Sequence, residues 1–169
     1  MNLGFIGLGV MGRPQAERLI NAGHTLSLYR VKKPSQHLVD LGAHSCDSPR
    51  AVAQAAAIVI LMLPDTPQVE DVLFGEDGVA QGLTAGKLVI DMSSISPTAT
   101  KILAQKIEAR GCSYLDAPVS GGEIGARNGT LSIMVGGRPE VFERARPLFE
   151  IMGQNITLVG DTGAGQTAK

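Results

Sequence analysis

Three glycines near the start of the chain have the spacing and the setting of a phosphate-binding turn. Gly7, Gly9 and Gly12 come after the apolar run Leu3–Ile6, which is too short for a helix, and before a segment with the apolar spacing of a helix. In such a turn the first glycine allows the bend and the second lets a pyrophosphate approach the backbone. The third lets the helix pack closely on the strand, and the helix dipole favours the phosphate charge. The pattern predicts a dinucleotide site, although a tight strand–helix turn without a ligand would use the same glycines.

Basic residues follow the second predicted strand, Thr25–Tyr29. In NAD-specific sites an acid lies about 20 residues past the glycines, whereas a nearby arginine accommodates the 2′-phosphate of NADP. Here Arg30, Lys32 and Lys33 occupy that region, and Asp40 lies too far along the chain, in a predicted helix. Arginine and lysine offer charge-assisted hydrogen bonds to a phosphate. We therefore expect NADP(H) to be favoured over NAD(H), with a solvated loop in a protein that uses either cofactor as the alternative.

The ends of later strands carry further candidates, because ligands in an open α/β sheet bind beyond the carboxyl ends of its strands. Pro64 ends the apolar run Ile58–Leu63, and its backbone could lie flat against a cofactor, although a strand-ending proline would look the same. Hydroxyls in the segment 93–96 could bond the ribose or amide of a nicotinamide. Ser96 before Pro97 is more typical of a helix cap.

Ser120, Gly121 and Gly122 follow the sixth predicted strand and form a candidate carboxylate site. A hydroxyl next to two glycines presents successive N–H groups, which make a small cradle for an anion. A flexible glycine loop would have the same composition. Lys169, taken alone, has the character of an ordinary solvated lysine.

Strand and helix patterns alternate along the whole chain. They predict an α/β fold of the Rossmann type, a doubly wound and mostly parallel sheet with helices on both faces. After the first strand, further strands are expected at 25–29, 43–46, 58–63, 88–92, 114–119, 131–135 and 156–159. Helices are expected after Gly12 and at 34–41, 49–55, 66–74, 97–110 and 139–152, and a glycine-rich loop is expected at 120–129. Residues 1–162 would form the dinucleotide-binding domain, and 163–169 would begin another helix.

Composition excludes several classes of protein. The 169 residues are 44% hydrophobic and 18% charged with a net charge of −1, which fits a globular domain and gives no basic surface for nucleic acid. No run of apolar residues approaches the length of a membrane span, and the first residues do not form a signal peptide. Two isolated cysteines and three scattered histidines predict neither a disulfide nor a metal site. A reducing cytoplasm is the expected location.

Five motifs occur together in the order and at the intervals of one known family. They are Gly4–Gly12, Met62–Pro64, Asp91–Pro97, Asp116–Gly122 and Gly163–Lys169. The chain resembles the β-hydroxyacid dehydrogenases, the group of 3-hydroxyisobutyrate dehydrogenase, over essentially its whole length. Within that group, Val69–Gly78 and Ser120–Gly137 are most similar to the tartronate semialdehyde reductases.

The resemblance implies an oxidoreductase in which a hydride passes from NADPH or NADH to tartronate semialdehyde, giving D-glycerate. Lys169 matches the family's catalytic lysine and would give a proton to the developing alkoxide. Substrate carboxylate would be bound by Ser120, Gly121 and Gly122. Cofactor contacts would come from Gly7, Leu8, Gly9, Val10, Met11, Gly12, Arg30, Leu63, Pro64 and Ser94.

The resemblance also implies parts that this sequence does not contain. Family members continue after the lysine into a long helix and an all-helical second domain, which supplies further substrate contacts and the contacts of a homo-oligomer. A non-catalytic NAD(P)-binding module is therefore one alternative, and a 3-hydroxyisobutyrate or succinic semialdehyde reductase is another. Gln15 stands where the family usually has methionine, and we expect this to change packing only.

Overall fold

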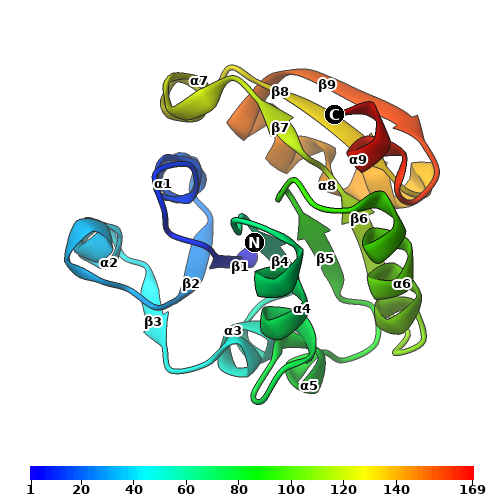
Figure 1. Ribbon diagram of the computed structural model, residues 1–169. Coiled ribbons are helices and arrows are strands. Elements are labelled where there is room, and N and C mark those ends of the chain that lie inside the picture. The colour runs from blue at the N-terminus through cyan, green and yellow to red at the C-terminus, as the bar shows by residue number, and fades with distance from the viewer.

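The computed structural model describes residues 1–169 and places one sheet between two layers of helices (Figure 1). Its strands are β1 (Asn2–Ile6), β2 (Thr25–Tyr29), β3 (His44–Cys46), β4 (Ile58–Leu61), β5 (Leu88–Asp91), β6 (Ser113–Asp116), β7 (Val119–Ser120), β8 (Leu131–Gly136) and β9 (Gly153–Gly160). Its α-helices are α1 (Gly12–Asn21), α2 (Gln36–Asp40), α3 (Pro49–Ala55), α4 (Thr66–Phe74), α5 (Val79–Gly82), α6 (Pro97–Glu108), α7 (Gly122–Asn128), α8 (Pro139–Met152) and α9 (Ala164–Ala168). None of these helices has the length and apolar character needed to cross a bilayer.

The strands lie in the order β3-β2-β1-β4-β5-β6-β8-β7, with β9 paired to β8. Pairing is parallel from β3 to β6, so the predicted mostly parallel, doubly wound sheet is confirmed. Strand order reverses between β1 and β4, which is the place where such sheets bind ligands. Strand β8 runs antiparallel to its neighbours β6 and β7, and β9 pairs parallel to β8.

Each face of the sheet has its own hydrophobic core. Phe5 and Ile60 point into one core with residues of α1, α2 and α8, whereas Ile6 and Val59 point into the other with residues of α3, α4 and α6. Because β4 is covered on both faces, all four of its residues are buried and apolar. The continuous apolar run at this place in the sequence is thereby explained.

Three of the predicted helix starts are confirmed by side-chain caps. Ser48 accepts a hydrogen bond from the backbone N–H of Ala51 at 3.0 Å, and Ser96 caps α6 in the same way. Asp65 caps α4 through the N–H of the following residue at 2.7 Å. A proline at or just after the first helical position follows each cap, where its missing N–H costs nothing.

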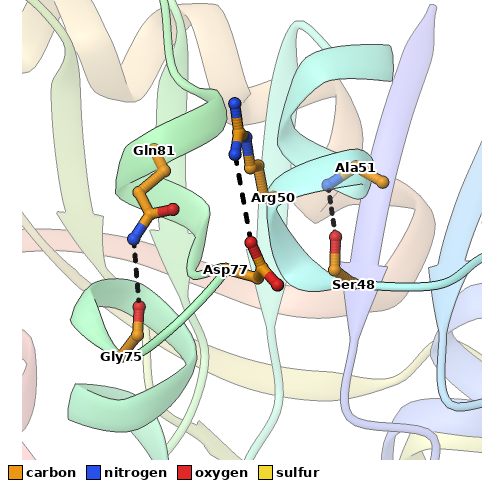
Figure 2. Close-up of polar contacts among 6 residues, drawn as sticks. All are labelled: Ser48, Arg50, Ala51, Gly75, Asp77 and Gln81. Atoms are coloured by element: carbon orange, nitrogen blue, oxygen red, sulfur yellow. Dashed lines mark hydrogen bonds and ion pairs between the residues drawn. The ribbon is translucent and has the colours of Figure 1, made fainter.

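Helix α5 is a short element that sequence patterns did not predict, since four residues are too few to show helical periodicity. It is held against α3 through the preceding loop, as Figure 2 shows. Arg50 lies 3.9 Å from the carboxylate of Asp77, and the backbone N–H of Arg50 donates to the carbonyl of Asp77 at 2.8 Å. The amide of Gln81 donates to the carbonyl oxygen of Gly75 at 3.5 Å (Figure 2).

Two expectations for the region after β5 are wrong. The single strand expected at 114–119 is divided into β6 and β7, because Pro118 has no N–H to give to a ladder. The loop expected at 120–129 is mostly the helix α7. Its glycines suggested a loop, but Gly125 lets the helix lie against β8, where a Cβ would come within 3.1 Å of Leu131. A third difference lies earlier in the chain, between β2 and β3. The helix expected at 34–41 starts later, after a 3-10 turn at Lys33–Ser35.

Gln15 is fully buried in the first core, between α1 and the ends of β5 and α8. Its amide nitrogen faces the sulfur atoms of Met92 at 3.8 Å and Met152 at 4.0 Å, which are weak acceptors. Its amide oxygen Oε1 is buried without any hydrogen-bond partner. The polar side chain of Gln15 therefore leaves an unsatisfied group in the core.

We predict that Gln15→Met stabilises the full-length protein. A buried unsatisfied polar group costs about 1–3 kcal/mol, and each kcal/mol raises the Tm of a domain of this size by roughly 2–4 °C. Thermal unfolding measures the change, and Gln105→Met on the exposed face of α6 is the matched control, expected to leave Tm unchanged. A lower Tm for Gln15→Met would show that the amide makes a favourable interaction.

Candidate cofactor and substrate site

Packing within the chain requires a glycine at two of the three glycine positions in the turn between β1 and α1, but not at the third. A Cβ on Gly7, whose φ is 112°, would collide with the carbonyl of Met62, and a Cβ on Gly12 would collide with the carbonyl of Gly7. A Cβ on Gly9 would meet nothing within 4 Å. Internal packing therefore does not explain Gly9, whereas the close approach of a phosphate to the backbone would explain it.

A cleft of about 360 Å³ opens directly beside this turn. Thirteen residues line it, among them Gly7, Leu8 and Gly9 of the turn. Arg30 and Lys32, which follow β2, also line it, but Lys33 does not. The structure thus brings several of the predicted pyrophosphate and ribose contacts together, and leaves Val10, Met11, Gly12 and Lys33 outside the lining of the cleft.

All the charged residues that line the cleft are basic. Its lining contains Arg13, Arg30 and Lys32 and no acidic residue. Arg30 has an exposed guanidinium 5.8 Å from the centre of the Tyr29 ring, and its φ of 63° is in the left-handed region, which is uncommon for a residue with a side chain. Such backbone strain is frequent where a residue is held for a ligand.

Arg13 and Ser35 are two of the cleft residues that sequence reasoning missed. Arg13 directly follows the third glycine of the motif, a position that could have identified it, and its Nη1 donates to the carbonyl of Leu8 at 3.3 Å. Ser35 is buried, and its hydroxyl accepts from the backbone N–H of Lys32 at 3.0 Å. This bond holds the backbone of the loop that carries Arg30 and Lys32, and no sequence motif predicts it.

The loops after β4 and β5 meet at the same edge of the sheet. Leu63 and Pro64 line the cleft, and the N–H of Leu63 donates to the hydroxyl of Ser93 at 2.8 Å. Ser94, which the family resemblance implied as a cofactor contact, is exposed and does not line the cleft. Its buried neighbour Ser93 instead holds the backbone of Leu63, which lines the cleft.

Asp91 lies beneath these loops as a fully buried carboxyl group. It accepts hydrogen bonds from the N–H of Ser93 at 3.0 Å and from the hydroxyl of Tyr114 at 3.2 Å. Loss of hydration raises the pKa of Asp91 to about 6, because burial outweighs these hydrogen bonds and nearby Asp116 adds a smaller contribution in the same direction. Burial also raises the pKa of Tyr114. Because Asp91 has no exposed oxygen, its role is to hold the loop that follows β5.

Lys169 and Ser120 meet although 49 residues separate them. The ammonium Nζ of Lys169 donates to Oγ of Ser120 at 3.1 Å, and both residues are exposed. Gly121 and Gly122 follow with φ of 134° and 62°, values that few residues other than glycine adopt. A Cβ on Gly122 would point into open space. A cation, a hydroxyl and a glycine turn therefore lie together, an arrangement that suits a carboxylate beside a reacting oxygen.

Other reactive side chains do not gather into a site. Cys46 and Cys112 are free thiols. No three His, Cys, Asp or Glu side chains lie close enough together to hold a metal ion.

Comparison with known proteins relates this geometry to a family. Residues 2–160 match the family model described as the NAD binding domain of 6-phosphogluconate dehydrogenase. The whole chain is 57% identical to 2-hydroxy-3-oxopropionate reductase of Escherichia coli K12, of which it covers 58%.

Solved structures share the fold closely. A 3-hydroxyisobutyrate dehydrogenase from Mycobacterium tuberculosis, determined with L-serine, is 36% identical with a TM-score of 0.92 over 99% of this chain and 57% of its own. Psf3, determined with NADP+ and 2-OPP, is 32% identical with a TM-score of 0.92 over 98% of this chain and 59% of its own. The chain thus spans less than two thirds of the length of each relative. It belongs to the 3-hydroxyisobutyrate dehydrogenase-like family, with an NAD-binding domain of the 6-phosphogluconate dehydrogenase type.

Proposed function

We propose that the chain is the cofactor-binding part of a reductase that converts tartronate semialdehyde (2-hydroxy-3-oxopropionate) to D-glycerate. The observation that carries the proposal is the contact between Lys169 and Ser120 at the carboxyl edge of the sheet. Similarity to the Escherichia coli reductase over the whole chain supports the choice of substrate.

The roles of the chain's own residues follow from their chemistry. Ser120 and the N–H groups of Gly121 and Gly122 hold the substrate carboxylate, which fixes the direction of the aldehyde. Lys169 donates a proton to the aldehyde oxygen, and its positive charge stabilises the negative charge that develops there. A bound nicotinamide supplies the hydride.

The cationic lining of the cleft supports NADP(H) as the favoured cofactor. Arg30 and Lys32 line the cleft and would bind a phosphate on the adenosine ribose, and the lining has no acid to accept from a ribose hydroxyl. The NADP+ bound in the structure of Psf3 is consistent with this choice in the family.

A second candidate substrate is a 3-hydroxyacid close to 3-hydroxyisobutyrate. The Mycobacterium tuberculosis relative is named a 3-hydroxyisobutyrate dehydrogenase, and its structure was determined with L-serine.

We predict that the full-length protein has its highest kcat/KM with tartronate semialdehyde, compared with methylmalonate semialdehyde and succinic semialdehyde under equal NADPH. A higher value for methylmalonate semialdehyde would support the second candidate, and cofactor binding without any turnover would leave only a binding module.

Lys169→Ala is expected to lower the kcat of the full-length protein by about 10²–10⁴-fold, the range typical of a lost general acid. The Kd for NADPH, measured by fluorescence titration, should stay within error because Lys169 does not line the cofactor cleft. Lys169→Arg keeps the positive charge but holds its proton too firmly to donate it, so it should stay nearly as slow. Wild-type turnover in Lys169→Ala would exclude the proton-donor role.

Arg30→Asn tests the cofactor preference, since asparagine tolerates the left-handed backbone at this position. Loss of charge-assisted hydrogen bonds worth about 1.5–3 kcal/mol should weaken NADPH binding by roughly 10–100-fold. NADH binding should change little. Lys33→Ala, just outside the cleft, is the control and should affect neither cofactor. An equal loss for NADPH and NADH would contradict recognition of the 2′-phosphate by Arg30.

A further inference from the structure

The short segment that carries Lys169 is fixed by a buried carboxylate. Asp116, at the end of β6, accepts from the N–H of Gly163 at 2.8 Å through one oxygen and from the N–H of Gln166 at 3.1 Å through the other. Asp116 is fully buried and Gln166 is 7% exposed. Helix α9 spans only five residues, and a helix of that length is not stable without such external contacts.

The side chain of Gln166 ties the same segment to the loop after β5. Its Nε2 donates to the carbonyl of Ser93 at 2.6 Å, and its Oε1 accepts from the N–H of Ile95 at 3.0 Å. Both ends of the amide are therefore used, in a buried place where an unpaired group would be costly. A methionine or leucine of similar volume could fill the space but could not make either bond.

The loop held by Gln166 is the one that supports the cofactor cleft. The hydroxyl of Ser93 holds the N–H of Leu63, and Leu63 lines the cleft. Lys169 lies three residues after Gln166, nearly one helical turn further on, and reaches Ser120. One chain of hydrogen bonds thus runs from the cleft through Ser93 and Gln166 to the segment with the lysine.

The backbone of this segment packs closely on the sheet. A Cβ on Gly165 would come within 2.9 Å of a carboxylate oxygen of Asp116 and would collide with the carbonyl of Met134. Helix α9 therefore lies directly on the end of β6 and on β8. With the backbone seated in this way, the amide of Gln166 is the side-chain link between α9 and the β5 loop.

We propose that Gln166 is a positioning residue that sets Lys169 relative to the cofactor cleft by clamping α9 to the Ser93–Ile95 loop. The proposal rests on the role of Lys169 as proton donor. Gln166 does not touch the reacting groups, so its effect on the reaction passes through the position of Lys169. Since a shift of about 1 Å in a catalytic group can cost around 100-fold in rate, a loosened clamp should be visible in kcat.

The first test is Gln166→Met in the full-length protein, assayed with tartronate semialdehyde and NADPH. We expect kcat to fall by roughly 10–100-fold with the Kd for NADPH unchanged. Gln166→Glu, which keeps the acceptor for Ile95 and loses the donor to Ser93, is the second variant if methionine impairs folding, and should also lower kcat. The control is Gln81→Met, because Gln81 also bonds a backbone carbonyl but takes no part in this network (Figure 2).

A double-mutant cycle separates positioning from a general structural effect. In single-turnover reactions at high enzyme concentration, either Gln166 variant should lower the rate of Lys169→Ala by less than 2-fold, because residues acting through one group are not additive. An unchanged kcat in the single variants, or an equal loss with and without Lys169, would overturn the positioning role while leaving the proposed function intact. Unchanged turnover in Lys169→Ala itself would overturn both.

Discussion

Parallel pairing of β1, β4, β5 and β6 is the constraint on which the site depends. It brings the carboxyl ends of these four strands to one edge of the sheet, and each end leads into a candidate functional segment. The glycine turn follows β1, Leu63 follows β4, the serine loop follows β5, and Ser120 follows β6 after a short break. Residues far apart in the sequence become neighbours because the strands share a direction and a register.

Buried hydrogen bonds then fix the loops that the sheet brings together. Asp91, Ser93, Gln166 and Asp116 form a network in which each side chain is paired, mostly with backbone groups. Fully satisfied polar networks of this kind make a structure rigid and specific, at a cost in desolvation, and the same burial raises the pKa of Asp91. Gln15 is the contrasting case, since its buried oxygen has no partner.

Local signals in the sequence predicted much of this arrangement. The glycine spacing and the caps at Ser48 and Ser96 depend on contacts within a few residues, so short patterns were sufficient to identify them. Helix α7 was missed because its glycines argue for a loop, and only packing of Gly125 against β8 decides the outcome. The role of Gln166 was out of reach, because its partners are backbone groups more than 70 residues earlier and leave no motif.

In the proposed reaction, Lys169 and Ser120 act together on one substrate beside the cofactor cleft. A crystal structure of the full-length protein with NADP+ and D-glycerate tests it most directly. We expect the glycerate carboxylate to contact Ser120 and the glycine turn after it, with Nζ of Lys169 about 3 Å from the hydroxyl formed in the reduction. Glycerate bound next to the nicotinamide with its hydroxyl facing another side chain, and Lys169 turned away, would exclude this shared role of Lys169 and Ser120.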